Sequence, residues 1–600
     1  MERKNNRNDS SQMKDLIQFD NPENKEKEKP REENQENGKG SSPEPAASGS
    51  CCAKDACEAS KSEPVRTRNG DVGSSCCRLD ELKKLPQCDI RLGTLSFTKS
   101  HIILIDVNAF SHGGRVLPQE GRDLWHSNFV KMPCSQYSLS PKPDVQLGPL
   151  KFKTGSGPVP RWNLISKQLS ALAAKKAAKV EEVEEAILNY NPKYRGEWSF
   201  DALANCLKMN PSFQNHFEKL FPKIAALALK LPEQVKKGIP LLQRHRPASI
   251  TLSQEQISCL LANAFYCTFP HRNTTSSNAE YHNYPSINFS RLFGNWSERK
   301  NQKFMALLQY FNVVTDEKSK PDGLVTFERR CLSDADVPNW ERCKDTLQKL
   351  HVTSQGSIEE EGTGMLQVDF AASWIGGGVL DSGLVQEEIL FLMNPELIVS
   401  RLFTERLDDK ECLIITGAQQ YSCYSGFSDS FKWVGPYDDH LQRDEWRRLK
   451  RQILAIDALH FKHQREQYSM ASVRRELNKA YCGFRGHYRD KEPDIATGKW
   501  GCGAFKGDKQ LKAVIQLMAA AKARRGLAFF TFGDEDLSRD LQHIYHLLVT
   551  QNMTVGETKI FVEVAITTGK GPDLRARLLL VAQGLLKEDR PSGSPQELCV

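Results

Sequence analysis

The chain has 600 residues, of which 39% are hydrophobic, enough for about three to five domains and at least one large core. Its 82 basic and 75 acidic residues give a net charge of +7, too mild and too mixed to indicate a nucleic-acid groove by itself. There is no apolar run of about 18 residues and no basic-then-apolar start at Met1, so we expect neither a membrane span nor a secretory signal.

Residues 1–85 are dense in Asn, Glu, Lys, Ser and Pro and carry few large apolar side chains. Such a segment cannot bury enough surface to offset the loss of chain entropy, so we predict a disordered tail. Within it, Met13 to Asp20 loosely resembles a sliding-clamp-binding peptide through Leu16 and Phe19, although a chance pair of apolar residues is the favoured alternative. The tail cysteines lack the paired spacing of zinc ligands, so we expect reduced thiols and no metal there.

Residues 86–350 have a mainly helical pattern and are predicted to form a helical accessory region. In "SQEQISCLLANAFYCTF", Ser253 and Gln256 form a capping box that predicts the start of a buried helix. Ser297–Phe311 and Ser166–Tyr190 also predict helices, the second of them broken near its middle. The sequence has no repeat of fixed period, which argues against a solenoid.

Residues 351–560 alternate short apolar strands with helices, a pattern typical of an α/β layer fold. Strands are predicted for "GMLQVDFA", "CLIITG", "ILAIDALHF" and "LAFFTFGD", and helices for "VRRELNKAYCGF" and "DKQLKAVIQLMAAAKARRG". Ligands of such folds bind at the carboxyl ends of the strands. Residues 561–600 form a C-terminal tail for which the sequence predicts no definite structure.

Two glycine-rich segments follow predicted strands. The strand Gly364–Ala371 leads into Gly376 to Gly378, and three glycines in a row can turn backbone N–H groups toward a phosphate because no Cβ atom blocks close approach. The segment Thr497–Asp508 also precedes a helix and would supply a second phosphate-binding loop. Neither segment matches G-x-G-x-x-G or G-x4-G-K-[ST], which argues against a Rossmann site or a P-loop.

The helix after the glycine triplet is predicted to begin at Asp381 or Ser382 and must end before Pro395. Glu388 lies among apolar residues of this helix, and such surroundings disfavour a charged carboxylate, which makes Glu388 a candidate proton donor. Glu387 points about 100° away, so the two acids cannot flank one bond as the paired acids of ordinary glycosidases do. An alternative is that both carboxylates lie in water and complement the helix dipole.

The segments "GGGVLDSGLVQEE", "TGKWGCGAFKGD" and "FFTFGD" together resemble the catalytic domain of the poly(ADP-ribose) glycohydrolases. The resemblance covers about Asp106 to Thr554 and includes "AILNYNPKYRGEWSFDAL" and "NPELIVSRLFTERL". It implies an α/β fold, a macrodomain-type mixed sheet between helices with a helical accessory region. It also implies hydrolysis of the ribose–ribose glycosidic bonds of poly(ADP-ribose), mainly from the chain end, with no metal and no cofactor.

The resemblance further implies roles for single residues. Glu388 would protonate the departing ribose oxygen and then take a proton from the attacking water. Glu387 would position a ribose hydroxyl, and Asp369 is the third essential acid of the family. The residues expected to contact the adenine, the diphosphate or the ribose of the substrate are Ile358, Glu359, Gly376, Gly377, Gly378, Gln386, Phe427, Gly503, Ala504, Phe505 and Phe532.

Three positions depart from the family pattern: Ala372 and Lys499 stand where asparagine is usual, and Phe427 where a tyrosine covers the ligand. Each change removes or alters a polar contact, at a cost of about 1 kcal/mol. Tyr421 and Tyr424 are candidates to compensate at Phe427. Two hypotheses therefore stay open: an active glycohydrolase, favoured because the acids are intact, and a catalytically weak module that binds poly(ADP-ribose).

The implied partner is poly(ADP-ribose) on modified proteins, which places the protein in the DNA damage response and in the nucleus and cytoplasm. We expect a monomer without membrane contact. The run "KEKEKPREE" is balanced by acids and predicts a solvated stretch better than a nuclear import signal.

Overall fold

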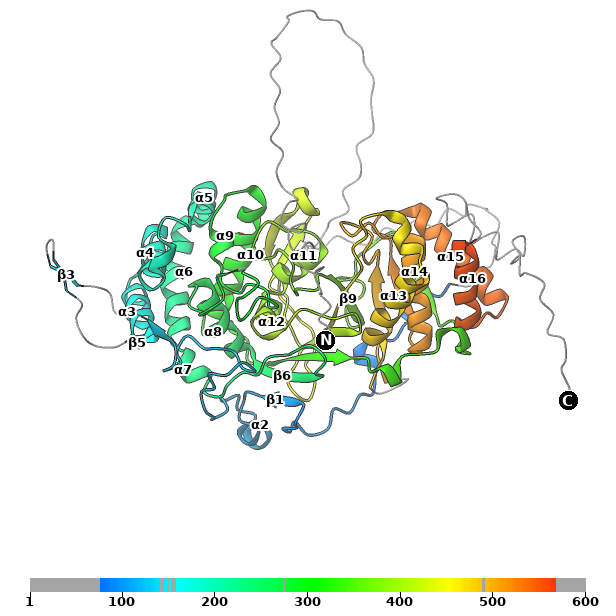
Figure 1. Ribbon diagram of the computed structural model, residues 1–600, viewed down its shortest axis with the longest axis horizontal. Coiled ribbons are helices and arrows are strands. Elements are labelled where there is room, and N and C mark those ends of the chain that lie inside the picture. The colour runs from blue at the N-terminus through cyan, green and yellow to red at the C-terminus, as the bar shows by residue number, and fades with distance from the viewer. Residues whose placement is uncertain are drawn as a thin grey trace, which may run out of the picture. The chain divides into compact units, whose positions relative to one another are not determined.

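A computed structural model describes most of the chain between residues 76 and 567 (Figure 1). The positions left out within that span are 141–144, 148–149, 153–157, 275 and 488–490. The predicted tail up to residue 75, with its clamp-like peptide and its charged run, and the C-terminal segment 568–600 lie outside the described residues. Among the helices of the described part, none combines the length and the apolarity that a membrane span needs.

In the described part of the chain, nine strands form one mixed sheet. Their order across the sheet is β1 (His101–Ile103), β6 (Ala248–Ser253), β7 (Leu324–Cys331), β10 (Glu411–Thr416), β13 (Gln452–Asp457), β9 (Leu366–Ala371), β14 (Ile495–Gly498), β15 (Leu527–Phe530) and β8 (Leu350–Thr353). The strands from β13 to β8 are parallel, whereas β10 is antiparallel to both its neighbours. The carboxyl ends of five neighbouring strands therefore meet at one edge.

The two faces of the sheet belong to different cores, as the alternation of side chains along β10 shows. Leu413 and Ile415 pack with the helical region, whereas Cys412 and Ile414 pack with the helices of the C-terminal half. Strands β14 and β15 are buried along their whole length, as expected for parallel strands covered on both faces. The predicted α/β class with a mixed sheet between helices is confirmed, and all four predicted strands are present.

The helices of the first core lie between residues 161 and 314 and are drawn in cyan to green in Figure 1. They are α3 (Arg161–Ala173), α4 (Val180–Tyr190), α5 (Asp201–Met209), α6 (Pro211–Leu229), α7 (Leu231–Gln234), α8 (Gln254–Phe265), α9 (Ser290–Phe293) and α10 (Glu298–Val314). The predicted break in Ser166–Tyr190 separates α3 from α4. The capping box is present as well, because the Ser253 side chain accepts from the Gln256 amide at 3.0 Å and the reverse bond is also 3.0 Å.

The helices of the second core follow the sheet strands of the C-terminal half: α13 (Met470–Phe484), α14 (Lys509–Lys522), α15 (Glu535–Thr550) and α16 (Val555–Thr567). Smaller elements are α2 (Val107–Gly113), α11 (Gln386–Met393), α12 (Ser400–Phe403) and the hairpin of β11 (Ser422–Ser425) and β12 (Lys432–Pro436). Two further strand pairs are β2 (Leu139–Ser140) with β5 (Val159–Pro160), and β3 (Val145–Leu147) with β4 (Leu150–Phe152). Residues 561–567 of the predicted C-terminal tail belong to α16, where Phe561 and Val562 are buried.

The predicted disordered tail ends earlier than residue 85, because residues 76–85 pack on the sheet. Leu82 is buried beside Ile358 and Met365, and the Cys77 amide donates to the Leu350 carbonyl at 2.9 Å. The composition of this segment did not predict the packing, because only a few apolar side chains in an otherwise polar sequence form it. Three sheet strands, β1, β6 and β7, come from the predicted helical region 86–350, whose boundary at residue 350 stays a prediction.

Phe265 of α8 joins the helices of the first core. Its ring lies 5.2 to 6.0 Å, centroid to centroid, from neighbouring rings of α6, α9 and α10, for example 5.2 Å from Phe293 and 5.6 Å from Phe311. Both of these contacts are edge-to-face, the arrangement that the ring quadrupole favours. Helix α10 runs from this core to the candidate site. The aromatic cluster therefore holds in place one of the helices that support that site.

Truncation of this ring is expected to weaken the whole first core. We expect Phe265→Ala to lower the free energy of unfolding by about 3–5 kcal/mol, because the surrounding aromatic rings cannot collapse into the cavity. The half-exposed Ile560 of α16 gives a control, for which Ile560→Ala is expected to cost less than about 1 kcal/mol. Urea midpoints followed by far-ultraviolet circular dichroism measure both, and equal midpoints would contradict the central role of Phe265.

Candidate active site

Four of the segments predicted to bind a ligand follow carboxyl ends of parallel strands. They are residues 354–359 after β8, 372–378 after β9, 499–508 after β14 and 531–534 after β15. Because these strands are neighbours in the sheet, the four segments gather at one edge. The sequence pattern had placed the site at this edge.

The glycine triplet passes close to two carboxylates. Gly376 and Gly377 have φ angles of +79° and +43°, in the left-handed region that favours glycine. A Cβ atom on Gly377 would lie 2.4 Å from Oε1 of Glu388 and 2.9 Å from Oε2 of Glu387. No other residue type fits this position without moving the acids.

Helix α11 begins at Gln386, with Val385 as its N-cap, and not at Asp381 or Ser382 as predicted. The chain between the triplet and α11 first turns back on itself, since the Asp381 amide donates to the Gly378 carbonyl at 2.9 Å. The carboxylate of Glu388 reaches back to the Val385 amide at 2.9 Å. Both acids consequently lie in the first turn of α11.

The two acids also bind the amides of the glycine loop. Glu387 accepts from the Gly376 amide at 2.6 Å and from the Ala372 amide at 2.8 Å, and Glu388 accepts from the Gly378 amide at 2.8 Å. Glu387 is 3% exposed and Glu388 is 6% exposed. The alternative that both carboxylates lie in water and only complement the helix dipole is therefore wrong.

Two buried cations hold the outer side of the glycine loop. Lys303 of α10 donates to the carbonyl of Gly378 at 2.8 Å and to those of Val379 and Asp381. Arg401 of α12 donates to the carbonyls of Ile375 and Gly377 at 2.8 and 3.0 Å. With its carbonyls turned toward these cations, the loop directs amides toward the acids.

Burial changes the proton affinity of both cations. It lowers the pKa of Lys303 to about 7 and that of Arg401 to about 10, and the neighbouring carboxylates partly oppose this effect. Sequence reasoning did not single out either residue. The sequence feature that could have indicated each of them is a basic residue within an apolar segment, "KFMALL" for Lys303 and "IVSRLF" for Arg401.

Asp369, in β9, shares this buried region with the acid pair. Neither of its carboxylate oxygens has a hydrogen-bond partner among the described residues. Burial raises the pKa of Asp369 well above its ordinary value, and the carboxylates of Glu388 and Glu359 raise it further. Burial is also the main reason why the pKa of Glu387 is raised. Asp369 and Glu388 raise it further, whereas the hydrogen bonds from two backbone amides lower it. Three neighbouring acids in one dry region disfavour full ionisation of the group.

Gln386 ties the acid helix to the end of β9. Its side-chain oxygen accepts from the Phe370 amide at 2.8 Å, and its amide nitrogen donates to the Val368 carbonyl at 3.3 Å. The same nitrogen lies 3.5 Å from the Glu359 carboxylate, whose pKa is raised by burial. Ile358 is buried beside Glu359, so the two residues expected at the adenine adjoin the acid helix.

Trp500 holds the second glycine-rich loop, 499–508, against the end of β13. Its indole donates to the Ile456 carbonyl at 3.0 Å, and the Lys512 ammonium lies 4.2 Å from the centroid of its ring. Asp508 caps α14 by accepting from the amide of Leu511 at 2.8 Å, as the predicted helix start requires. The part of this loop expected at the diphosphate is open, since Gly503 and Ala504 are exposed.

The aromatic residues expected at the ligand lie in three separate loops. The ring of Phe505 lies 5.4 Å from that of His460. Phe532 has a φ of +50° and is 39% exposed, and the ammonium of Lys499 lies 5.9 Å from its ring. Phe427, 54% exposed, lies in the turn between β11 and β12.

The two tyrosines considered as compensation for Phe427 have different surroundings. Tyr421 is buried and donates to Glu396 at 2.6 Å, so its hydroxyl belongs to the core. Burial raises the pKa of Tyr424, and the nearby Glu359 adds to the rise, which puts Tyr424 beside the residues expected at the adenine. Within the described residues, no group of three or more His, Cys, Asp or Glu side chains is placed to hold a metal ion.

The chain matches two models of one protein family. Residues 210–329 match "Poly (ADP-ribose) glycohydrolase (PARG), helical domain", and residues 337–539 match "Poly (ADP-ribose) glycohydrolase (PARG), Macro domain fold". It is 32% identical to poly(ADP-ribose) glycohydrolase 1 of Arabidopsis thaliana, over 57% of this chain and 76% of the relative. It is 30% identical to probable poly(ADP-ribose) glycohydrolase 2 of that plant, over 57% and 77%. Poly(ADP-ribose) glycohydrolase 1 of Caenorhabditis elegans is 33% identical, over 56% of this chain and 42% of the relative.

The raised pKa of Asp369 predicts a pH-dependent cost to stability. Between the unfolded value near 4 and the higher folded value, the native protein keeps a proton that the unfolded chain has released. The free energy of unfolding therefore falls as pH rises through this interval, by up to about 1.4 kcal/mol per pH unit. We expect Asp369→Asn, which has no proton to lose, to gain stability relative to wild type as pH rises.

Melting temperatures of both proteins at pH 5, 7 and 9 measure this difference. The exposed Glu445 gives the control, since Glu445→Gln is expected to keep a constant difference from wild type. A difference between Asp369→Asn and wild type that shrinks with rising pH would contradict the raised pKa.

Proposed function

The chain belongs to the poly(ADP-ribose) glycohydrolase family, and we propose that it hydrolyses the ribose–ribose O-glycosidic bonds of poly(ADP-ribose) and releases ADP-ribose, mainly from the polymer end. It is thus a glycosidase. The observation that carries the proposal is the acid pair Glu387 and Glu388, buried and bonded to the amides of the glycine loop beside Asp369.

Glu388 is the proposed general acid and base. Its carboxyl group gives a proton to the departing ribose oxygen as the glycosidic bond breaks, and it then takes a proton from the water that attacks the oxocarbenium-like carbon. The bonds from the Gly378 and Val385 amides fix the orientation of both its oxygens. A fixed carboxyl group needs little reorganisation when the bond breaks.

Glu387 and Asp369 support this step in the proposal. Glu387 positions a ribose hydroxyl, and Asp369 is the third acid of this buried group. The adenine lies by Ile358 and Glu359, whereas the diphosphate lies between the triplet and the loop at Gly503 to Phe505. Phe532 and Phe427 border the ribose side.

The substrate suggests where the protein acts. We propose that it works on poly(ADP-ribose) attached to modified proteins in the nucleus and cytoplasm, during the DNA damage response, as a monomer. A contact of the Met13–Asp20 peptide with a sliding clamp is a weaker proposal, supported only by its sequence spacing.

A poly(ADP-ribose)-binding module with little turnover is the second candidate function. It is favoured by Ala372, Phe427 and Lys499, which replace polar side chains usual in the family. Against it stands the backbone amide of Ala372, which binds Glu387 without any help from the side chain.

The proton-transfer role predicts the behaviour of Glu388→Gln. We expect wild type to release ADP-ribose from automodified polymerase and the variant to release it at least about 100-fold more slowly, because an amide cannot give the proton. Free ADP-ribose measured over time decides this, and products separated by length show whether monomers leave from the end.

The control for this experiment is Glu445→Gln, an exposed acid outside the site that should retain full activity. Filter binding must show that Glu388→Gln still holds the polymer, and its melting temperature must show that it is folded, since the amide replaces an acceptor of two backbone N–H groups. No release by wild type at high enzyme concentration would leave the binding module as the function.

Phe427 predicts an effect on affinity. We expect Phe427→Tyr to tighten inhibition by ADP-ribose several-fold, because a hydroxyl at this exposed turn restores a polar contact worth about 1 kcal/mol. Inhibition constants of both proteins in the release assay measure it. An unchanged constant would show that the hydroxyl is irrelevant.

A further inference from the structure

Helix α6 carries a line of basic residues on its exposed side. His216, Lys219, Lys223 and Lys230 follow one another at intervals of three, four and seven residues, so they share one face of the helix. Lys230 is the first residue after the helix. We name these four residues the basic stripe.

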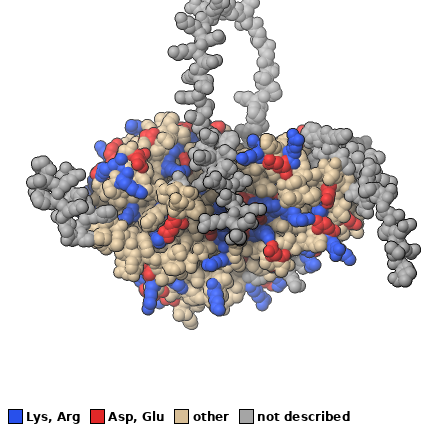
Figure 2. Space-filling model, in the orientation of Figure 1, with Lys and Arg blue, Asp and Glu red and all other residues tan. Residues whose placement is uncertain are grey.

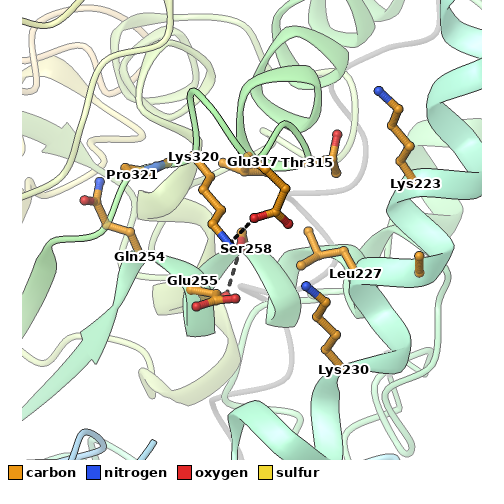
Figure 3. Close-up of a pocket in the computed structure, with 12 residues that line it drawn as sticks. Lys223, Leu227, Lys230, Gln254, Glu255, Ser258, Thr315, Glu317, Lys320 and Pro321 are labelled. Atoms are coloured by element: carbon orange, nitrogen blue, oxygen red, sulfur yellow. Dashed lines mark hydrogen bonds and ion pairs between the residues drawn. The ribbon is translucent and has the colours of Figure 1, made fainter. Parts of the chain in front are cut away.

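The stripe borders two surface hollows. The larger, of about 390 Å³, is lined by residues of α3, the segment that follows it, α6 and α10, and includes Lys175, Lys176, Lys219 and Lys223 but no acidic residue. The smaller, of about 170 Å³, shares Lys223 with it. Figure 3 shows Lys223, Lys230 and Lys320 around this smaller hollow, with Lys320 paired to Glu317 at 2.6 Å.

Most of the charge at the larger hollow is not neutralised. Lys175 pairs with Glu182, but Lys176, Lys219 and Lys223 form no ion pair or side-chain hydrogen bond with any described residue. On the face of the molecule shown in Figure 2, basic and acidic side chains are interspersed. Three unpaired lysines from two chain segments around one hollow therefore stand out as a place for an anion.

The stripe leads away from the candidate active site. At the start of α6, the ring of Phe213 lies 6.2 Å from that of Trp433, edge to face. Trp433 belongs to β12, the second strand of the hairpin whose turn carries Phe427. From Phe213 to Lys230 the helix advances about 25 Å. The line of positive charge thus runs from the border of the proposed substrate site along the larger hollow to the smaller one.

We propose that the basic stripe and the larger hollow bind a remote part of the poly(ADP-ribose) chain while its end occupies the active site, an inference that rests on the proposed function. Each unit of that polymer carries an anionic diphosphate, so charges repeat along its length as they do along α6. Phe213, 39% exposed, offers a ring on which an adenine stacks. A nucleic acid is the less favoured occupant, because the unpaired charge is confined to a few lysines.

The test compares substrates of two lengths. The variant Lys219→Gln, Lys223→Gln, Lys230→Gln is expected to raise KM for long poly(ADP-ribose) about tenfold, with kcat and all kinetics on a two-unit oligomer unchanged. The salt dependence of KM for the long polymer should also flatten by about one unit of slope for each phosphate that the variant no longer binds. The matched control removes three exposed lysines that line neither hollow, Lys167→Gln, Lys208→Gln, Lys344→Gln, and should leave KM for both substrates as in wild type.

The outcomes separate this inference from the proposed function. Equal kinetics of stripe variant and wild type on long polymer overturn the remote contact and leave the hydrolase intact. An equal loss on both substrates also overturns it, since the stripe then acts on the active site itself. No turnover of the two-unit oligomer by wild type overturns the proposed function. A variant that loses affinity for a DNA oligonucleotide, with unchanged polymer kinetics, identifies a nucleic-acid surface instead.

Discussion

The site depends on one set of hydrogen bonds, those that two buried cations donate to carbonyls of the glycine loop. Lys303 and Arg401 bind carbonyls within residues 375–381, so neighbouring amides face inward. Those amides then fix the acids of α11. Without the cations the loop carbonyls would be buried without partners, at about 1–3 kcal/mol each, and the acids would lose their donors. The helical region supplies Lys303, which makes it part of the architecture of the candidate active site.

This arrangement is costly for the fold. Asp369, Glu387 and Glu388 lie together where solvent is excluded, and Asp369 has no hydrogen-bond partner among the described side chains and amides. Such a group persists only where the surrounding structure holds it in place. The cations counter part of the charge but do not touch Asp369 directly. An unpaired acid buried beside two further acids is the pattern expected where proton affinity has been tuned for chemistry.

Local patterns predicted the strands, the Ser253 capping box and the glycine loop, because each of these follows from neighbouring residues. The start of α11 was predicted too early, since the turn before it is held by tertiary bonds to Lys303, about 75 residues away in sequence. The roles of Lys303 and Arg401 escaped prediction for the same reason. A buried cation that binds backbone carbonyls has only a weak signature in the sequence, a charged residue within an apolar segment.

The side chains that depart from the family pattern lie outside the hydrogen-bonded group of acids, loop amides and cations, and they leave its hydrogen bonds intact. Ala372 still gives its backbone amide to Glu387. Lys499 packs over Phe532, and Phe427 is exposed on a hairpin turn, so neither touches the acids or the cations. Changes at such positions alter how strongly a ligand is held, whereas the proposed proton transfer depends on the orientation of Glu388. A chain under selection only to bind the polymer would have no reason to keep three acids buried at a cost to its stability. The retained centre therefore favours the hydrolase over the binding module.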